Sequence, residues 1–372
     1  MNYTFIILFI LIMLLTMAFL FIHFKNLSWI RRFTHPTWLP ILLSLILVAM
    51  CFVLSFTVSI ATTIVILYLI YAFIICDILH LILRKVLKKD TMKNKWNWIY
   101  HSGILAFLIT ICFLILSYYN AIHVEIKEYA LHTEKELQSD KLTIALISDL
   151  HMDTTMSIEK LEEYCNQINE KNPDVILLLG DIFDESTRKE SMELACQAFG
   201  KLTSTYGTYY VFGNHDVNNY RPIVNISKKE IVDNLAKNNV TVLDDESILL
   251  NNSFYLIGRS DISFFKNSNR KTISDLIEPL DSSKYMILLD HQPLETKTAA
   301  SHGIDLQLSG HTHGGQIWPT GVIAKLFQIN EINYGLEEIG DYKAIVTSGI
   351  GAWGYALRLG SNSEIVIITV TN

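Results

Sequence analysis

Hydrophobic positions are distributed very unevenly along the chain. The first third contains four long apolar stretches, whereas the remainder alternates between short apolar runs and polar segments. Each long stretch approaches the roughly 20 residues that a helix needs to cross the hydrocarbon core of a bilayer. We therefore predict an N-terminal transmembrane region of four helices within residues 1–119. The predicted helices cover about residues 4–24, 39–57, 61–83 and 98–119.

Basic residues are concentrated in two of the segments that join the predicted spans. The segment at 25–38 contains three Lys or Arg residues, and the segment at 84–97 contains six. Because cytoplasmic loops carry an excess of Lys and Arg, both segments are predicted to face the cytoplasm. Four spans then place both termini outside. The sequence thus predicts a multi-pass cell-membrane protein whose C-terminal domain is extracytoplasmic.

The two parts of the chain carry opposite net charge. Residues 1–119 contain nine of the 30 basic residues and two of the 37 acidic ones, so residues 120–372 have a net charge of −14. A domain this acidic is poorly suited to the phosphate backbone of nucleic acids, which binds basic surfaces. We therefore expect no nucleic-acid partner. Because of the predicted transmembrane region, we expect membrane lipids as partners.

From residue 142 onward, short apolar runs alternate with segments of helical periodicity. This alternation is typical of an α/β fold with buried sheets and helices packed outside them. Residues 142–372 are predicted to form one α/β sandwich, which a linker or edge strand at 120–141 joins to the transmembrane region. The predicted strands cover residues 142–147, 175–179, 208–212, 254–257, 286–289, 304–308, 345–347 and 365–370.

Five polar runs follow apolar runs of this kind. The carboxyl ends of parallel strands meet at one edge of a sheet, so side chains from these distant runs are expected to converge. Convergent Asp, Asn and His side chains favour a two-metal site that cleaves phosphoesters. The runs are Asp149-Leu150-His151, Gly180-Asp181-Ile182-Phe183-Asp184, Gly213-Asn214-His215-Asp216, Asp290-His291 and Gly310-His311-Thr312-His313-Gly314-Gly315-Gln316.

The second and third runs carry the most specific residue types. Asp181 follows a strand and a glycine, and the two oxygens of its carboxylate can each bind one cation. Asn214 offers a neutral oxygen ligand for a hard cation, and His215 comes next. Asp216 is expected to hold that imidazole charged and oriented. Taken singly, such residues are also common in ordinary turns, and only their combination favours a metal site.

The fifth run is the strongest single signal. His311 and His313 alternate after a predicted strand, and the glycines around them leave room for close approach of backbone and ligand. A mixed set of carboxylate, amide and imidazole ligands suits Mn²⁺, Fe or Zn²⁺. The lack of cysteine among the candidate ligands argues against a structural zinc site.

Over about residues 142–372, the five runs together resemble those of the calcineurin-like metallophosphoesterase superfamily. The chain is most similar to a bacterial membrane-associated branch, which contains UDP-2,3-diacylglucosamine pyrophosphatase-like enzymes and transmembrane metallophosphoesterases. The resemblance implies two β-sheets packed together with helices outside them. It also implies two divalent metal ions as cofactors.

The same resemblance implies a role for each motif residue. His215 would contact the phosphoryl oxygens or protonate the leaving group, with Asp216 behind it. Arg358 matches an arginine near the end of related chains and would touch phosphate. One metal would be held by Asp149, His151, Asp181 and His313, and the other by Asp181, Asn214, His291 and His311, with Asp181 as the bridge.

Together these features favour a metal-dependent hydrolase that cleaves phosphodiester or pyrophosphate bonds. The transmembrane region favours a lipid-linked or envelope substrate. Soluble nucleotides or envelope polymers are the alternative substrates. A non-catalytic membrane sensor is disfavoured, because such a protein is expected to have lost His215 or a metal ligand, and this chain retains them all.

An apolar run follows the fifth polar run and allows two interpretations. Its side chains either line an acyl groove or dip into the membrane interface, or they pack beneath the metal site. The residues are Ile317, Trp318, Val322, Ile323, Leu326 and Phe327.

An ionisable pair in the third predicted span and two cysteines in the C-terminal domain are interpreted as structural. Asp77 and His80 lie one helical turn apart, where we expect them to reach headgroups or to pair with His101. Cys165 and Cys196 fall in predicted helices without C-x-x-C spacing, so two free thiols are favoured over a disulfide.

Overall fold

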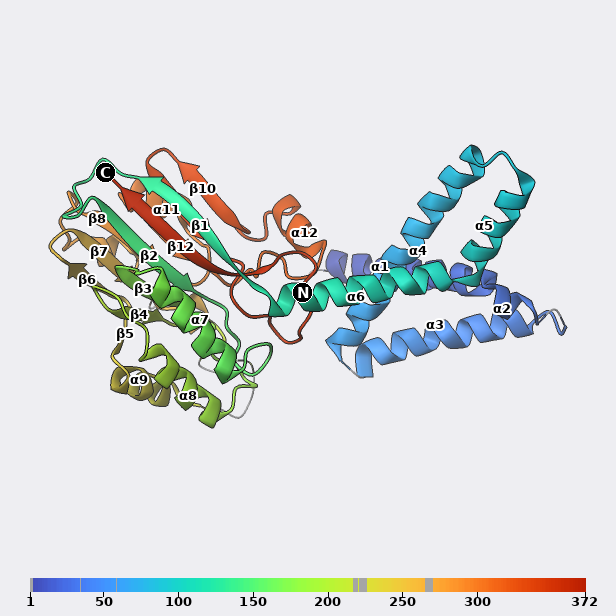
Figure 1. Ribbon diagram of the computed structural model, residues 1–372, viewed down its shortest axis with the longest axis horizontal. Coiled ribbons are helices and arrows are strands. Elements are labelled where there is room, and N and C mark those ends of the chain that lie inside the picture. The colour runs from blue at the N-terminus through green and yellow to red at the C-terminus, as the bar shows by residue number, and fades with distance from the viewer. Residues whose placement is uncertain (1–2, 34, 58, 217–219, 221–225, 265–269) are drawn as a thin grey trace. The chain divides into compact units, whose positions relative to one another are not determined.

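The structure is a computed structural model of residues 1–372, and it describes all of them except 1–2, 34, 58, 217–219, 221–225 and 265–269. The chain divides into two compact units (Figure 1). The first comprises Met1–Leu116 and the second comprises Ser117–Asn372.

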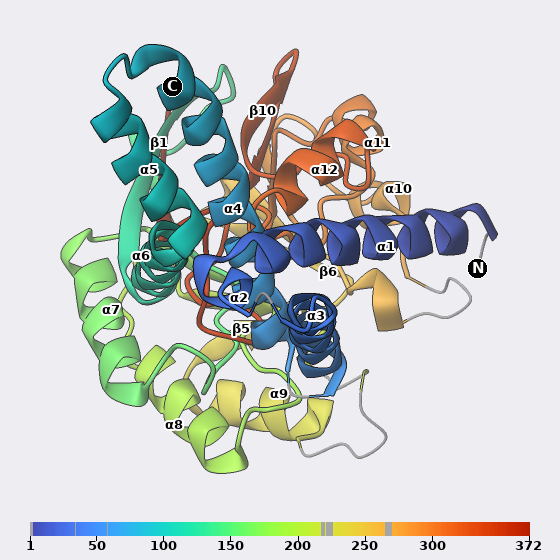
Figure 2. The same ribbon diagram turned by 90° about the vertical axis from the view of Figure 1, so that its right-hand side faces the viewer.

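Helices are the only regular elements among the described residues of the first unit. A buried apolar cluster that includes Leu20, Phe24, Ile30 and Ala72 holds the helices together. Helix packing joins the first helix to the third and the third to the fourth. Figure 2 shows these helices from another side. The helices are α1 (Tyr3–Asn26), α2 (Ser28–Arg31), α3 (Leu39–Thr57), α4 (Ile60–Val86), α5 (Asp90–Ser102) and α6 (Ile104–Ile122), the last of which continues into the second unit.

Among the described residues, two helices rather than four are long and apolar enough to cross a membrane. These are α4 and α6. The described apolar segments of α1 and α3, residues 10–26 and 39–55, are shorter. The structure therefore supports two candidate spans where the sequence predicted four.

The fourth predicted span also begins later than expected. Gly103 adopts a left-handed conformation with φ of 76° and separates α5 from α6. Residues 98–102 therefore belong to α5, and the candidate span begins at Ile104. A glycine just past the last helical residue is a common helix terminator, because it reaches positive φ without a steric penalty.

Asp77 and His80 belong to a polar cluster within the helical unit. Tyr100 donates a hydrogen bond from its hydroxyl to Asp77 Oδ1 at 2.7 Å, and His23 Nε2 lies 3.1 Å from the same carboxylate. The ring of His80 lies edge-on to that of His101, with centroids 6.3 Å apart. The expected neighbour His101 is thus near His80, whereas Asp77 pairs with partners from α1 and α5.

The second unit contains two mixed six-stranded sheets, which confirms the predicted α/β sandwich. In the first sheet the order is β1 (Val124–His132), β12 (Ser363–Thr371), β2 (Lys141–Ile147), β3 (Val175–Leu179), β4 (Thr208–Val211) and β5 (Val240–Val242). In the second sheet the order is β10 (Gly335–Ile339), β11 (Tyr342–Val346), β9 (Leu306–Ser309), β8 (Tyr285–Leu289), β7 (Phe254–Gly258) and β6 (Glu246–Leu250).

Alternate residues of the central strands enter two different apolar cores. In β2, Ala145 and Ile147 join one buried cluster, while Ile144 and Leu146 join the other. Successive side chains of a strand point to opposite faces, so a strand buried on both faces reads as a continuous apolar run. The cluster between the sheets contains residues of both, such as Leu177 and Ile287.

Helices cover the outer faces of the two sheets (Figure 1). On the first sheet they are α7 (Ile158–Glu170), α8 (Lys189–Phe199) and α9 (Lys228–Lys237). On the second they are α10 (Ile273–Ile277) and α11 (Thr296–Ser301). Cys165 of α7 and Cys196 of α8 point into the buried cluster under these helices. Both thiols are free, which confirms the prediction of unpaired cysteines.

Strand direction determines which loops share an edge. β2, β3, β4 and β5 run parallel to one another, whereas β12 runs antiparallel to β2, and β1 is parallel to β12. The start of β1 and the start of β12 therefore lie at the edge where β2 and β3 end. Residues 124–132 form the edge strand of this sheet, and His123 alone separates β1 from α6.

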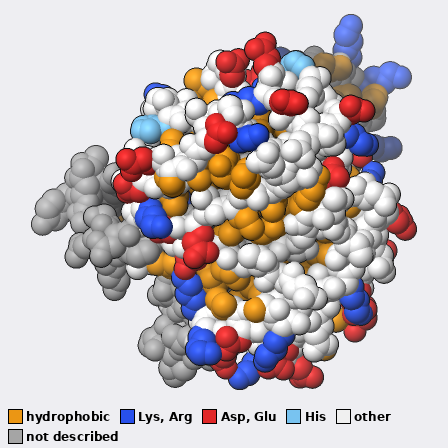
Figure 3. Space-filling view, turned by 90° about the vertical axis from the view of Figure 1, so that its left-hand side faces the viewer, with side chains coloured by type: hydrophobic (Ala, Val, Ile, Leu, Met, Phe, Trp, Pro, Cys, Tyr) orange, Lys and Arg blue, Asp and Glu red, His pale blue; other side chains and the backbone are white. Residues whose placement is uncertain are grey.

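The surface of the second unit mixes charges of both signs. On the face shown in Figure 3, Asp and Glu side chains are interspersed with Lys and Arg side chains around an apolar centre. The net acidic charge is therefore not gathered into one acidic region on this face.

Candidate metal centre

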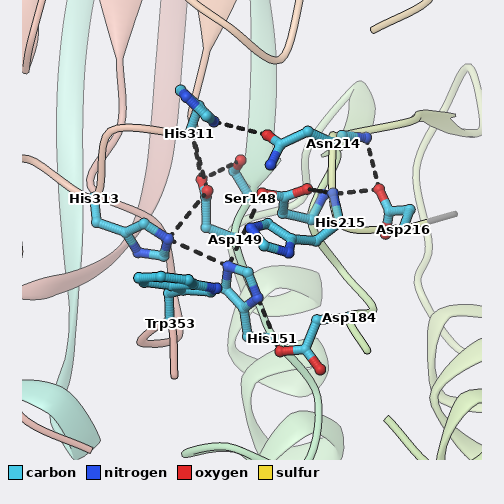
Figure 4. Close-up of polar contacts among 12 residues, drawn as sticks. Ser148, Asp149, His151, Asp184, Asn214, His215, Asp216, His311, His313 and Trp353 are labelled. Atoms are coloured by element: carbon cyan, nitrogen blue, oxygen red, sulfur yellow. Dashed lines mark hydrogen bonds and ion pairs between the residues drawn. The ribbon is translucent and has the colours of Figure 1, made fainter. Parts of the chain in front are cut away.

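All five polar runs emerge at the carboxyl ends of strands on one edge of the sandwich, and Figure 4 shows residues of the first, second, third and fifth runs. The runs follow β2, β3 and β4 in the first sheet, and β8 and β9 in the second. Because the two sheets pack face to face, these strand ends bring residues that are more than 160 positions apart into contact, as with His151 and His313.

One group of potential ligands consists of Asp149, His151 and His313. Each offers one ligand atom, these atoms lie within 4.8 Å of one another, and all three residues are buried. The Nε2 atoms of the two imidazoles face each other at 3.2 Å, and His313 Nε2 is 3.5 Å from Asp149 Oδ1. Facing ring nitrogens and a carboxylate oxygen form a donor set that suits a divalent transition metal.

A second group consists of Asp181, His291 and His311, whose ligand atoms also lie within 4.8 Å of one another. His311 Nδ1 is 2.8 Å from Asn214 Oδ1, which brings the predicted amide ligand to this group. His291 Nε2 lies 3.0 Å from Asp181 Oδ2, yet this buried nitrogen has no hydrogen-bond partner of suitable geometry. His291 Nδ1 lies 2.8 Å from Leu179 O, so a proton on Nδ1 would leave Nε2 free to bind a cation.

Asp181 is close to both groups. Its Oδ2 atom is 3.0 Å from His291 Nε2 and 4.0 Å from His151 Nε2. Its Oδ1 atom accepts a hydrogen bond from the backbone N–H of His215 at 2.7 Å. One carboxylate thus adjoins both groups, and the residues present fit two divalent ions that share Asp181.

The backbone at these positions is unusual for residues other than glycine. Left-handed φ values cost free energy and persist only where the surrounding structure holds them, and they cluster at functional sites. Five of the predicted ligands have φ between 44° and 69°: Asp149, His151, Asp181, His311 and His313.

Two glycines allow the strand ends to approach one another this closely. A Cβ atom at Gly213 would overlap the carboxylate of Asp181, and one at Gly310 would overlap that of Asp149. Only glycine leaves room for these carboxylates, so both glycines shape the site directly.

The protonation of the candidate ligands follows from their surroundings. Burial raises the pKa of Asp181, but the nearby His291, His151 and His215 outweigh it and bring the pKa below its ordinary value. Burial, followed by the neighbouring charge of His151, lowers the pKa of His313 well below its ordinary value. An ionised carboxylate and a neutral imidazole are the forms in which these side chains bind metals.

Behind the ligands, two buried side chains orient the imidazoles. Asp184 Oδ2 lies 3.1 Å from His151 Nδ1, so a proton on Nδ1 would leave Nε2 free to bind. Arg358 Nη2 lies 3.3 Å from His313 Nδ1. Sequence reasoning did not assign this role to Asp184, although it is the last residue of the second run.

Arg358 is not placed to touch phosphate, contrary to our expectation. The residue is fully buried, and its guanidinium donates to the backbone oxygens of Gly349 at 3.1 Å and Asn362 at 2.9 Å. Burial lowers its pKa to about 10. The arginine therefore supports His313 from a fully buried position.

His215 lies beside both groups and belongs to neither. Glu185 holds its Nδ1 atom, with both carboxylate oxygens at 3.1 Å. Burial lowers the pKa of His215, but the hydrogen bond with Glu185 and the charge of Asp181 outweigh it and raise the pKa above its ordinary value. Glu185 directly follows the second run, and sequence reasoning overlooked it.

Asp216 does not lie behind His215, contrary to the prediction. Its carboxylate accepts hydrogen bonds from the backbone N–H groups of Asp181 at 2.8 Å, Phe183 at 2.9 Å and Gly213 at 2.6 Å. The side chain thus ties the second run to the third. Asp216 supports the backbone that presents Asp181. Glu185, and not Asp216, contacts the ring of His215.

Comparisons with known proteins agree with this architecture. A family model described as calcineurin-like phosphoesterase matches residues 142–315. An uncharacterized metallophosphoesterase of Helicobacter pylori strain J99 is 34% identical over 249 residues, which cover 66% of this chain and 63% of the relative. An uncharacterized metallophosphoesterase of Aquifex aeolicus is 30% identical over 250 residues, which cover 66% of this chain and 91% of the relative.

A Bos taurus protein named transmembrane protein with metallophosphoesterase domain is 31% identical over 246 residues, which cover 61% of this chain and 52% of the relative. The chain thus spans less than two thirds of the length of the Helicobacter and bovine relatives. It belongs to the calcineurin-like metallophosphoesterase family, as the resemblance of its five polar runs implied.

Proposed function

We propose that this protein is a membrane-anchored phosphoesterase that hydrolyses phosphodiester or pyrophosphate bonds with two divalent metal ions. The observation that carries the proposal is the pair of ligand groups, with Asp181 a member of one group and 4.0 Å from His151 of the other. When bound, two such cations supply Lewis acidity toward phosphoryl oxygens and an activated water nucleophile at neutral pH. The ligand types suit Mn, Fe or Zn.

His215 supplies the proton that the leaving oxygen requires. Its ring lies beside the ligand groups, with its centroid 5.3 Å from that of His151. Glu185 fixes the ring through Nδ1, which directs Nε2 away from that carboxylate. A raised pKa keeps a larger fraction of His215 protonated near neutral pH, as a general acid requires.

Hydrolysis of a panel of substrates tests the proposal. The full-length protein, purified in detergent and loaded with Mn²⁺ or Zn²⁺, is incubated with bis(p-nitrophenyl) phosphate, a dinucleotide pyrophosphate and lipid-linked phosphodiesters. We expect turnover of the aryl diester and faster turnover of a lipid-linked ester than of the soluble nucleotide. Metal-loaded protein that cleaves none of these compounds would instead support the non-catalytic sensor.

Replacing Glu185 with Gln should change the pH profile rather than metal content. The carboxylate raises the pKa of His215, so its loss lowers that pKa. A general acid must be protonated, and the alkaline limb of kcat should therefore move to lower pH. The measurement is kcat against pH, with the exposed Glu190→Gln as the control. An unchanged alkaline limb in Glu185→Gln would exclude this role for Glu185.

The second unit is proposed to lie outside the cytoplasm in a multi-pass protein. The segment at 84–97, from the last residues of α4 into α5, contains six basic residues, which favours a cytoplasmic location. Because α6 leads from this segment into the second unit, the unit falls on the opposite side of the membrane. This location of the second unit does not depend on whether α1 and α3 also cross the membrane.

Reporter fusions test this topology. We expect alkaline phosphatase fused after Asn372 to be active in cells, because the enzyme requires an extracytoplasmic location. The same reporter fused after Lys89, in the basic segment, should be inactive. The opposite pattern, or an active cytoplasmic reporter after Asn372, would reverse the proposed orientation.

A further inference from the structure

The apolar run after the fifth polar run is exposed on the second unit. Helix α12 (Thr320–Leu326) and its flanks pack inward through Ile317 and Ala324, which are buried. Most of the run does not pack beneath the metal site, because its other large apolar side chains are exposed. Six large apolar side chains are between 42% and 73% exposed: Trp318, Val322, Ile323, Leu326, Phe327 and Ile329. We call these six residues the α12 surface.

The six exposed apolar side chains of the α12 surface lie within 12 residues of the chain. Isolated exposed apolar residues need no explanation, whereas a cluster marks an interaction surface. Lys325, in the last turn of the same helix, is also exposed. Apolar side chains with an adjacent cation are typical of segments that lie in the interface of an anionic bilayer.

The α12 surface is connected to the last turns of α6 through one hydrogen-bonded loop. The backbone N–H of Arg358 donates to Ser117 O at 2.8 Å, within the part of α6 that belongs to the second unit. The backbone N–H groups of Leu359 and Gly360 donate to Gln316 O at 2.9 and 3.0 Å. Gln316 directly precedes the α12 region, and Figure 1 shows α12 and this end of α6 at the same end of the sheets.

The end of α6 also indicates where the bilayer interface lies. Tyr118 and Tyr119 are both more than half exposed. Tyr and Trp are enriched at membrane–water interfaces, because their rings combine an apolar body with a polar tip. Only His123 follows α6 before β1 begins, and one residue extends at most about 3.6 Å. The second unit therefore cannot move far from the point where the candidate span ends.

The metal centre lies at this same edge. The side chain of Arg358, whose backbone contacts α6, reaches to 3.3 Å from the ligand His313. Trp353, from the same loop, is 41% exposed, and its ring centroid is 5.8 Å from that of His215. Trp353 thus places an exposed apolar ring beside the proposed general acid.

We propose that the α12 surface docks on the bilayer interface and presents the metal centre to phosphoesters in lipid headgroups. The docking follows from the exposed side chains and from their connection to α6. The substrate class rests on the proposed phosphoesterase function. Docking raises the local concentration of headgroups at the site without any further contact with the substrate.

Site-specific photo-crosslinking tests the docking without any use of activity. The full-length protein carries p-benzoylphenylalanine in place of Phe327, or in place of Leu194 on α8 as the matched exposed control. Each is reconstituted into vesicles of phosphatidylcholine and phosphatidylglycerol with alkyne-tagged acyl chains. We expect at least about tenfold more tagged lipid at position 327 than at position 194. Equal labelling at the two positions, or crosslinking of position 327 to a second copy of the chain, would overturn the docking.

A kinetic comparison tests the substrate class. The double variant Leu326→Ser/Phe327→Ser and the control Leu194→Ser are assayed on long-chain phosphatidylglycerol in vesicles and on its water-soluble dihexanoyl form. The ratio of the two rates should fall about tenfold in the double variant and stay constant in the control. A constant ratio in both would overturn the lipid substrate class. Lipid labelling at position 327 without hydrolysis of any ester would leave the docking intact and overturn the phosphoesterase function.

Discussion

In an Asp181→Ala variant, we expect metal binding to weaken at least about a hundredfold and phosphodiester hydrolysis to be lost. Asp181 adjoins both ligand groups, with its Oδ2 atom 3.0 Å from His291 Nε2 and 4.0 Å from His151 Nε2. Its removal takes one ligand from the second group and the adjoining carboxylate from the first. It also leaves His291 buried without its anionic partner. The measurements are metal content by mass spectrometry after loading with Mn²⁺ or Zn²⁺, and the rate on bis(p-nitrophenyl) phosphate.

The matched control for this variant is Asp153→Asn. Asp153 lies just beyond the first polar run, also has a positive φ of 77°, and pairs with the exposed Arg188. Its replacement should leave metal content near that of the unmodified protein. Full metal content in Asp181→Ala would contradict the shared position of Asp181. Unmodified protein that binds no metal after loading would contradict the two-metal site as a whole.

A His215→Ala variant should bind metal normally and lose activity by about 10²–10⁴-fold, the usual contribution of general acid catalysis. His215 belongs to neither ligand group, so the metal ligands remain. Its backbone N–H donates to Asp181 at 2.7 Å, and alanine keeps that hydrogen bond. The measurements are metal content and kcat on the same diester.

Substrate choice gives this variant an internal control. An activated leaving group such as p-nitrophenolate needs little protonation, whereas an alkyl alkoxide needs it strongly. The loss in His215→Ala should therefore be larger for an alkyl phosphodiester than for the aryl one. An equal loss for both esters would indicate a role other than proton donation. A variant that has lost its metal would show that His215 supports the ligand groups.

The elements that carry the site were predictable from the sequence for a clear physical reason. β2 and β3 are buried on both faces, so β3 appears as an uninterrupted apolar run and β2 as one interrupted only by Thr143. The polar residues that follow them have no core to enter and must lie at the strand ends. Parallel order then brings Asp149 and Asp181 to one edge. The strands β5, β6 and β10 were missed because they are short or partly exposed and their apolar runs are broken by polar residues.

Side-chain direction around the site was not predictable in the same way. Asp216 follows His215 directly, but adjacency in a loop does not determine which way a carboxylate points. Its carboxylate instead turns toward three backbone N–H groups that β3 and β4 leave unpaired at their ends. Glu185 reaches His215 from the loop just after the second run, and only the packing of the two loops makes that contact.

The sequence by itself determined the fold class, the five polar runs and the ligand types, because burial and strand periodicity leave a direct imprint on residue order. Tertiary structure alone decided that Arg358 is buried behind His313 and that the α12 surface is exposed. An arginine or an apolar run has the same sequence whether it faces a core, a substrate or a bilayer. Which of these it meets depends on the elements that fold against it, and those come from distant parts of the chain.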